Sequence, residues 1–321
     1  MTGAVLVALL VITGGLASCS SSPAKSIGSS RSTTTTVPTP ELLNYAAPSL
    51  PANFNPLTPA GDSIATLQVM AQIWPSPFII SPQFTPALNF SFTSSAELVS
   101  VAPETIVYQI NPKAKWSDGV PVSADDFIYN WHAQSGDSQF TDVGGAQFEV
   151  DSTLGYSDIA SVIGSNNGET VTVVFKQPYS DWESLFSPLV PAHIAQKYGW
   201  NSGFSSFDPK IEVSAGPFEI QSSTSGSLVL MRNPSYWGPP AQLSEINFIL
   251  VTTPDSYAGD LANGHIQLVE APAQVDLVQQ IEGLRNVSSP LQIVPDLNFE
   301  EIDFNQRNPW LSQLPIRQAI A

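Results

Sequence analysis

The sequence predicts an α/β protein, because segments with the alternation of β-strands and segments with helical periodicity follow one another along most of the chain. The 321 residues are 42% hydrophobic, which is enough for a substantial core, and the length suits about two ordinary domains. No internal repeat is visible. These observations favour a mixed globular fold over an array of repeats.

The first elements are expected soon after residue 42, where the composition becomes more apolar. Residues 43–47 read as a strand that runs into a proline-rich loop. Ser63 can cap a helix. Four apolar side chains at helical spacing should face the core from that helix: Ile64, Leu67, Met70 and Trp74. Residues 78–80 and 88–90 are short, apolar and expected to be extended.

The middle of the chain gives clearer signals. Residues 105–110 alternate, with Ile106, Tyr108 and Ile110 on one face, so a half-buried strand is expected. Ser123 and Asp126 have the S-x-x-D spacing of a capping box and should begin a helix. Two aromatic residues four positions apart, Phe127 and Trp131, should face the core from it. Residues 170–175 are rich in β-branched residues and read as another strand.

The last third of the chain mixes strands and helices again. A hairpin is expected around Ser225-Gly226. The two strands of this hairpin are predicted at residues 218–222 and 228–232. Further strands are predicted at residues 246–251, 266–269 and 299–305. Helices are expected to begin at Thr253-Pro254, ending at Gly264, and to span residues 273–284.

The charge composition excludes one class of partner. Charged residues make up 12% of the chain, about half of the usual share of roughly 25%. The net charge is −17 and the calculated pI is about 4.2. Such a surface repels phosphate backbones, so nucleic acid is not an expected partner, and charge alone does not favour binding to anionic lipid.

The N-terminus predicts export. Residues 4–17 are apolar but too short for a membrane span of about 20 residues, so they fit the core of a signal peptide. They end in Leu-Ala-Ser before Cys19, the only cysteine, and this ending resembles the bacterial lipobox. We therefore expect a signal peptide over residues 1–19 and lipid on Cys19, where two acyl chains would suffice for stable anchoring. The alternative is a secretory signal followed by a chance cysteine, and no Lys or Arg precedes the apolar run.

Residues 20–41 are rich in Ser, Thr and Pro and nearly free of large apolar residues. Such a segment cannot bury a core, so a disordered tether is expected there. A tether after a lipid-bearing cysteine would hold a globular body away from a membrane.

Three motifs follow in a fixed order. The first is W-S-D-G-V-P-V-S-A-D-D-F over residues 116–127. The second pairs G-P-F over residues 216–218 with R-N-P-S-Y-W-G over residues 232–238. The third pairs F-N over residues 304–305 with P-I-R-Q-A-I over residues 315–320. Each has a local physical account, because Asp-Gly and Asn-Pro favour turns and the aromatic residues bury large areas.

Together these motifs resemble the family 5 extracellular solute-binding proteins, the oligopeptide, dipeptide and nickel receptors of ABC importers, from about residue 42 to residue 321. The residues that carry the resemblance, for which mainly structural roles are expected, are Trp116, Asp118, Gly119, Ala124, Asp126, Gly216, Pro217, Asn233, Pro234, Tyr236, Trp237 and Arg317. The resemblance implies an α/β, periplasmic-binding-protein type II fold with two lobes. It also implies ligand contacts near Asn55, Ser214, Ala215 and Asn305.

The resemblance also implies a domain plan. A main lobe is expected from residues 42–56 and 181–298, an inserted subdomain from residues 57–180, and the start of a second lobe from residues 299–321. Family members continue well beyond the segment that ends this chain, so we expect most of the second lobe to be missing. A complete protein is expected to be a monomer.

The function implied is non-enzymatic. The chain would be the binding component of an ABC importer, exported and lipid-anchored on the outer face of the membrane or periplasmic, which captures oligopeptides or a similar small solute and delivers them to a permease. A nickel or metal-chelate receptor and a surface lipoprotein without transport stay open. No cofactor or metal site is expected, because His132, His193 and His265 lie far apart in sequence. A hydrolase is disfavoured because no G-x-S-x-G motif occurs, although His193 near Asp181 could imitate part of a triad.

Overall fold

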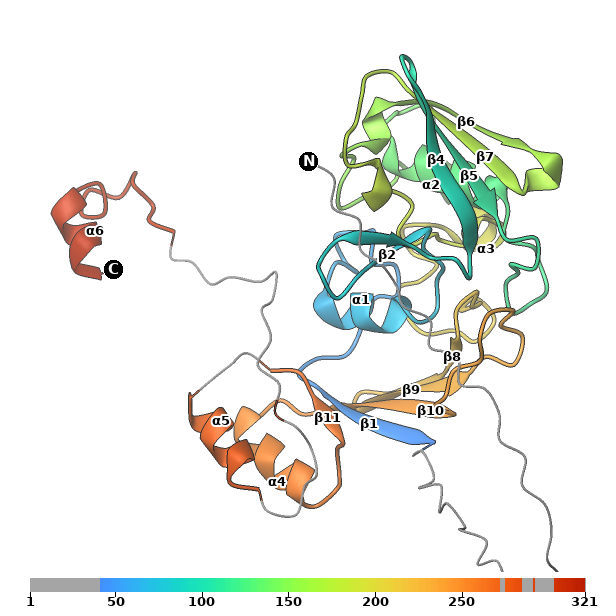
Figure 1. Ribbon diagram of the computed structural model, residues 1–321. Coiled ribbons are helices and arrows are strands. Elements are labelled where there is room, and N and C mark those ends of the chain that lie inside the picture. The colour runs from blue at the N-terminus through green and yellow to red at the C-terminus, as the bar shows by residue number, and fades with distance from the viewer. Residues whose placement is uncertain (1–40, 272–274, 285–290, 292–302, 321) are drawn as a thin grey trace, which may run out of the picture. The chain divides into compact units, whose positions relative to one another are not determined.

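A computed structural model describes residues 41–271, 275–284, 291 and 303–320, and it confirms the α/β class. The first sheet has five strands in the order β11-β1-β10-β9-β8 (Figure 1). Their bounds are β1 Leu42–Ala47, β8 Phe218–Ser223, β9 Ser227–Arg232, β10 Glu245–Leu250 and β11 Leu268–Val269. Strand β1 pairs in parallel with both β10 and β11, whereas β8, β9 and β10 are antiparallel. The predicted hairpin is therefore present as β8 and β9.

A second, antiparallel sheet has four strands in the order β4-β5-β7-β6. Their bounds are β4 Thr93–Val101, β5 Glu104–Ile110, β6 Ile159–Ser165 and β7 Thr170–Phe175. On β5 the three residues predicted to face the core, Ile106, Tyr108 and Ile110, are at most 3% exposed. A separate short pair joins β2 Phe78–Ile80 to β3 Pro86–Leu88. Sequence analysis missed β4 and β6, the two edges of the four-stranded sheet.

Six α-helices lie in the described part of the chain. Their bounds are α1 Ile64–Met70, α2 Ala124–Gln134, α3 Ala192–Tyr198, α4 Tyr257–Ala262, α5 Val275–Glu282 and α6 Leu314–Ile320. Short 3₁₀ turns cover Val143–Gly145, Tyr156–Asp158, Asn166–Gly168, Trp182–Ser184 and Pro254–Ser256. Both predicted caps form: Ser63 Oγ accepts from the Thr66 amide, and Ser123 with Asp126 completes the capping box of α2.

The buried face of α1 differs from the prediction. Ile64 and Leu67 are 66% and 44% exposed, while the buried stripe runs through Val69, Met70 and Ile73. Two stripes of apolar residues share the same helical period in this segment, and the sequence alone does not say which one meets the core. The prediction was right for Met70 and for Trp74, which lies beyond the end of the helix and is 2% exposed.

Two other predictions need correction, and the predictions for the N-terminus lie outside the described residues. Residues 303–305, the described end of the strand expected at 299–305, have no regular structure. Strand β11 is limited to Leu268–Val269, shorter than the predicted 266–269. The signal peptide, Cys19 and nearly all of the tether lie outside the described residues. Within the described residues, no helix combines the length and apolarity that crossing a membrane requires.

Most buried side chains form one core that takes residues from both sheets, including Tyr45 and Phe248 from the first and Tyr108 and Val173 from the second. A smaller cluster, with Ala46, Tyr257, Leu261, Ile266 and Leu277, packs α4 and α5 onto the parallel strands. The five-stranded sheet takes its strands from the residues expected to form the main lobe, and the four-stranded sheet takes its strands from the residues expected to form the inserted subdomain. Within residues 181–298, Phe186 packs on Phe127 of α2 and the amide of Ala192 donates to Asp126, while the carbonyl of Trp200 accepts from Asn55, so this stretch contacts both expected parts. The exact boundaries stay a prediction.

Candidate functional site

The parallel strands point to a site at their carboxyl ends. In open α/β sheets, ligands bind outside the carboxyl ends of parallel strands, because the following loops open a crevice there. Here Tyr45 lies near the end of β1, and Glu270 directly follows β11. Gln68, on α1, completes a hydrogen-bonded cluster with them. We call these three residues, Tyr45, Gln68 and Glu270, the site triad.

The site triad is centred on one carboxylate oxygen. Tyr45 Oη donates to Glu270 Oε2 at 3.4 Å, and Gln68 Nε2 donates to the same oxygen at 3.2 Å. Gln68 Nε2 also lies 3.1 Å from Tyr45 Oη. Burial, and then the charge of Glu270, raise the pKa of the Tyr45 phenol, so the phenol stays protonated and acts as a donor. The triad therefore holds an exposed carboxylate in a fixed orientation.

An exposed apolar stripe borders the triad. Ile64 and Ala71 lie four residues before and three residues after Gln68, so the three side chains share one face of α1 and its C-cap. Leu67 borders this face, and all three apolar residues are exposed. We call Ile64, Leu67 and Ala71 the α1 stripe. A carboxylate beside an apolar stripe can contact a charged group and an apolar group of one solute.

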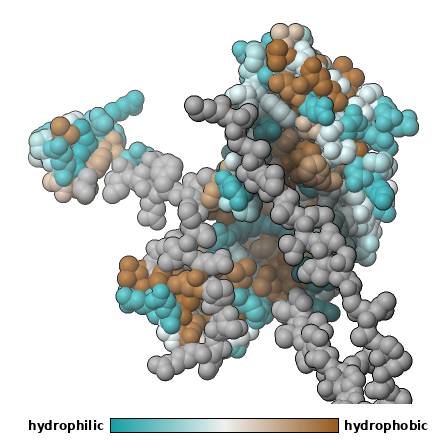
Figure 2. Space-filling view, viewed as in Figure 1, coloured by the Kyte–Doolittle hydropathy of each residue, from teal (hydrophilic) through white to brown (hydrophobic). Residues whose placement is uncertain are grey.

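Exposed apolar residues are not confined to the α1 stripe. Figure 2 shows apolar residues gathered around α5 and on the part of the molecule that contains the four-stranded sheet. Val275 at the start of α5 is 73% exposed, and Val99 and Val101 at the end of β4 are 55% and 74% exposed. The α1 stripe differs from these residues because it shares a helix face with Gln68 of the site triad.

The segment before β8 is tied to the end of α1. Ser214 Oγ donates to the carbonyl of Ile73 at 3.0 Å and accepts from the amide of Gly216 at 3.0 Å. The amide of Ala215 donates to the same Ile73 carbonyl at 2.9 Å. A Cβ at Gly216 would lie 2.1 Å from the carbonyl oxygen of Gln72, so only glycine allows this close approach. We call Ser214, Ala215 and Gly216 the strap.

Three of the four residues implied as ligand contacts are buried in the described structure. Asn55, Ser214 and Ala215 are 0%, 0% and 2% exposed. Asn55 Nδ2 donates to the carbonyl of Trp200, and its Oδ1 accepts from the amide of Leu57. In the described structure their polar atoms are engaged in internal contacts, and contact with ligand stays a prediction for these three residues. Asn305 is exposed, with Oδ1 accepting from the amide of Arg307, and contact with ligand stays a prediction for it.

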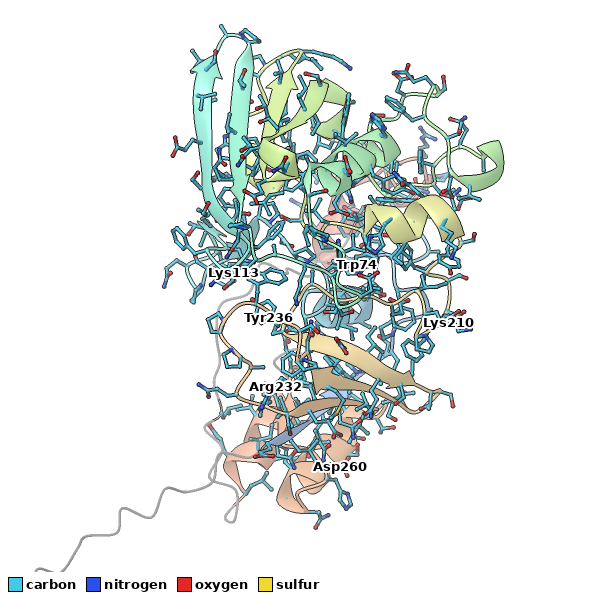
Figure 3. All side chains as sticks on the ribbon, turned by 90° about the vertical axis from the view of Figure 1, so that its right-hand side faces the viewer. Trp74, Lys113, Lys210, Arg232, Tyr236 and Asp260 are labelled. Atoms are coloured by element: carbon cyan, nitrogen blue, oxygen red, sulfur yellow. The ribbon has the colours of Figure 1, made fainter. Side chains whose placement is uncertain are left out.

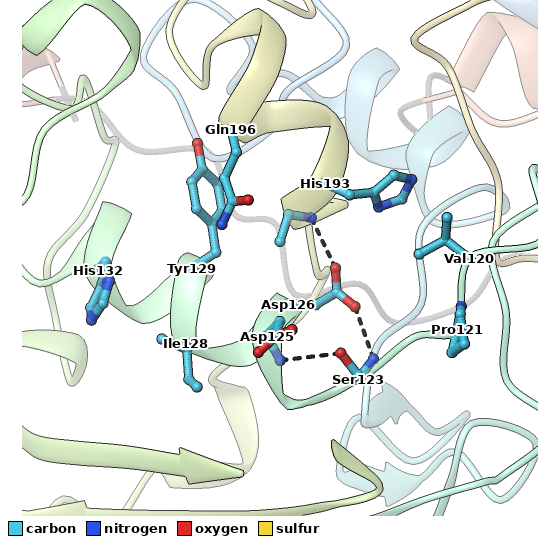
Figure 4. A pocket seen from close by; sticks show the side chains of 11 residues that line it. Val120, Pro121, Ser123, Asp125, Asp126, Ile128, Tyr129, His132, His193 and Gln196 are labelled. Carbon is cyan, nitrogen blue, oxygen red and sulfur yellow. Dashed lines mark hydrogen bonds between the residues drawn. The ribbon is translucent and has the colours of Figure 1, made fainter. Parts of the chain in front are cut away.

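The first motif builds the turn before α2. Trp116 is fully buried, Gly119 has φ of +92°, and Asp118 Oδ1 accepts from the amide of Val120. Ala124 is 2% exposed at the start of α2. Asp126 is 3% exposed, and its carboxylate accepts from the amides of Ser123 and Ala192 at 2.9 and 2.8 Å (Figure 4). One carboxylate thus caps α2 and fixes the start of α3.

An open hollow of about 270 Å³ lies beside these caps, between α2 and α3 (Figure 4). His132 and His193 line this hollow, and Figure 4 shows them on opposite sides of Asp125 and Asp126. His193 Nε2 lies 2.9 Å from Asp118 Oδ2, not beside Asp181 as a triad would need, while His132 stacks on Phe140. Asp126 and His193 make structural contacts there, whereas the buried Tyr129 hydroxyl has no hydrogen-bond partner in the described structure. None of the lining residues comes from the parallel strands, and on that ground this hollow ranks below the site triad.

The second and third motifs also make structural contacts. Asn233 Nδ2 donates to the carbonyl of Gly216 at 2.9 Å, which fixes the bend at Gly216-Pro217 directly before β8. Pro234 is exposed in the next turn, Tyr236 packs on Trp237, and Trp237 Nε1 donates to the carbonyl of Ser91. Arg232, whose side chain is labelled in Figure 3, donates to the carbonyls of Gln242 and Leu243. Arg317 donates to the carbonyls of Leu311 and Ser312, ahead of α6.

Metal-ligating residues do not cluster in the part of the chain that the structure describes: no group of three or more His, Cys, Asp or Glu side chains there could hold one ion. His265 pairs with Asp260 at 3.3 Å beside a second open hollow of about 520 Å³ next to β10. Sequence reasoning missed the site triad, whose members lie more than 200 residues apart along the chain except for Tyr45 and Gln68. The one local hint of the site triad was Tyr45, a tyrosine within the first predicted strand.

The fold, with its site at the carboxyl ends of parallel strands, is that of the type II periplasmic binding proteins, and solved structures of that class superpose on it. The profile of the bacterial extracellular solute-binding proteins, family 5, matches residues 92–321. The chain belongs to this family of solute-binding proteins.

Individual relatives match over part of their length. The chain is 27% identical over 277 residues to the probable monoacyl phosphatidylinositol tetramannoside-binding protein LpqW of Mycobacterium tuberculosis, covering 83% of this chain and 41% of that protein. It is 32% identical over 216 residues to the oligopeptide-binding protein OppA of Mycobacterium bovis, covering 65% of this chain and 35% of OppA. The solved periplasmic EDTA-binding protein EppA superposes with a TM-score of 0.69 at 30% identity, covering 76% of this chain and 46% of EppA. The chain thus spans less than half the length of each.

Proposed function

We propose that the chain belongs to the solute-binding component of an ABC importer, which captures an oligopeptide or a similar small solute without chemical change and delivers it to a membrane permease. The observation that carries the proposal is the family match over residues 92–321. The site triad and the α1 stripe support it, because together they offer a charged acceptor and apolar surface to a solute.

Peptide is the favoured class of solute. The relative OppA is named as an oligopeptide-binding protein and shares 32% identity with this chain. Strand β11 is an edge of the five-stranded sheet and leads directly into Glu270. An extended peptide can pair its backbone groups with such an edge while its side chains contact nearby apolar surface. Capture between two lobes that close around the solute would follow the hinge motion common in binding proteins.

A metal chelate is the second candidate solute, because the relative EppA is named as an EDTA-binding protein. Calorimetry of the full-length protein separates the two. We expect saturable heat with tri- to nonapeptides and none with nickel–histidine, Fe(III)–EDTA or sugars. Binding of a chelate or a sugar alone would remove the peptide claim and leave the solute-binding class intact.

Export and anchoring complete the proposal. The apolar run at residues 4–17 and Cys19 support a lipoprotein outside the cytoplasmic membrane, and we expect the complete protein to be a monomer. A surface lipoprotein without transport would carry the same signals. Genes for a permease and an ATPase beside the gene for this chain would favour transport, and their absence would favour the other role.

A further inference from the structure

The carboxylate of Glu270 is held in place by its neighbours yet keeps one side open. Both donors of the site triad, Tyr45 Oη and Gln68 Nε2, reach Oε2. Within the described residues, Oε1 has no hydrogen-bond partner. Glu270 is exposed, so Oε1 is accessible to a solute. Two neutral donors orient the carboxylate without cancelling its charge.

The charges around the triad favour a cation. The hydrogen bonds that reach Glu270 come from a phenol and an amide, and no Lys or Arg forms a salt bridge with it in the described chain. The net charge of −17 adds a general attraction for cations. An ammonium group at Oε1 would make a charge-assisted hydrogen bond, which is stronger than one between neutral groups.

The α1 stripe defines what should accompany that cation. Gln68 contacts Glu270, and Ile64 and Ala71 lie on the same face of the helix as Gln68. Ile64 is 66% exposed and Leu67 is 44% exposed. Apolar atoms of a solute whose ammonium reaches Glu270 would therefore lie along the stripe and lose contact with water.

We infer that Glu270 binds an ammonium group of the solute, oriented by Tyr45 and Gln68, and that the α1 stripe receives the apolar part next to that group. This inference rests on the proposed function and narrows its solute class to peptides with an accessible ammonium beside an apolar side chain. The ammonium can be the amino terminus or a lysine side chain.

Three probe peptides test the inference by calorimetry with the full-length protein. Trileucine carries only an N-terminal ammonium, N-acetyl-Leu-Lys-Leu carries only a side-chain ammonium, and N-acetyl-trileucine carries neither. In Glu270→Gln, affinity for at least one ammonium peptide should fall about tenfold or more, which is the order of a charge-assisted hydrogen bond, while affinity for N-acetyl-trileucine stays within about twofold. Which ammonium peptide loses affinity identifies the source of the cation.

In Glu270→Gln the new side chain keeps an acceptor oxygen for Tyr45 and Gln68, so the fold should be retained. An unchanged melting temperature of the variant without ligand checks this. Glu282→Gln, a matched change on the exposed surface of α5, should leave all three affinities unchanged and so controls for net charge. Equal affinities in wild type and Glu270→Gln, or an equal loss for all three peptides, would overturn the inference but not the peptide function. If the wild type binds none of the three peptides, the inference fails, while the peptide function is decided separately by the calorimetry with tri- to nonapeptides described above.

Discussion

The hydroxyl of Ser214 donates a hydrogen bond to the main-chain carbonyl of Ile73, 141 residues earlier in the chain, at 3.0 Å. Ile73 lies just beyond the end of α1, and Ser214 begins the strap that leads into β8. The bond therefore ties α1, which carries the stripe and Gln68, to the five-stranded sheet, which carries Tyr45. Loss of this tie should affect both the stability and the geometry of the site.

Ser214→Ala should lower the free energy of unfolding by about 1–3 kcal/mol, because the buried amide of Gly216 loses its acceptor. Urea denaturation of the full-length protein measures this. Ser184→Ala is the control, since Ser184 Oγ donates to Asp181 in an exposed turn and should change stability by no more than about 0.5 kcal/mol. Equal effects of the two changes would contradict the role given to Ser214.

Gly216→Ala should be more damaging than the loss of a hydrogen bond. The added methyl group would lie 2.1 Å from the Gln72 carbonyl oxygen, and both partners are main chain, so neither can move freely. We expect a loss of about 3 kcal/mol or more. Gly226→Ala, in the turn between β8 and β9, meets no atom within 4 Å and provides the matched control. A Gly216→Ala protein with the melting temperature of wild type would refute the close approach of strap and helix.

Strong local signals explain which elements could be predicted. Strand β5 has strict alternation, and α2 begins with a capping box, so both were found from sequence. Strand β4 has two irregularities in its pairing with β5, which break the alternation of its faces, and β6 is a half-exposed edge strand with small residues. Helix α3 has seven residues and no side-chain cap, so no local signal marks its start.

The site was harder to predict than the fold for a different reason. Tyr45 and Glu270 lie 225 residues apart, and they meet because β1 and β11 pair in parallel. Parallel pairing between distant strands leaves no mark in local sequence patterns. The motif residues were visible because turns and caps are local, and Asp126, for which a structural role was expected, accepts from the amides of Ser123 and Ala192.

Cys19→Ala tests the anchoring proposal. Without the acceptor cysteine no lipid can be attached, so the protein should move from the membrane fraction to the soluble fraction, and its processed mass should change. Cell fractionation with mass spectrometry measures both. Ser18→Ala keeps the cysteine and should leave the distribution as in wild type. A Cys19→Ala protein that stays in the membrane fraction with unchanged processed mass would refute lipidation.

Glu212, two residues before the strap, should make stability depend on pH. Its carboxyl is 6% exposed, and neither oxygen has a hydrogen-bond partner in the described structure. Burial, and then the charge of Asp208, raise its pKa from the ordinary 4.5 to about 8. The folded protein therefore binds this proton more tightly than the unfolded chain, so stability should fall as pH rises from about 4.5 to about 8.

Glu212→Gln removes this titration. The stability of the variant minus that of wild type should therefore rise by about 3 kcal/mol in free energy of unfolding from pH 4.5 to pH 8.5. This is less than the full pKa difference implies, because water can relax around a buried charge. Urea denaturation at the two pH values measures the gain. Glu97→Gln, on the half-exposed edge strand β4, controls for loss of one negative charge. The neutral amide remains unpaired in the variant, so only the pH dependence, and not the absolute stability at pH 4.5, tests the argument. If wild type and Glu212→Gln lose stability in parallel as the pH rises, Glu212 is not the group that titrates, and its carboxylate must find partners in solution.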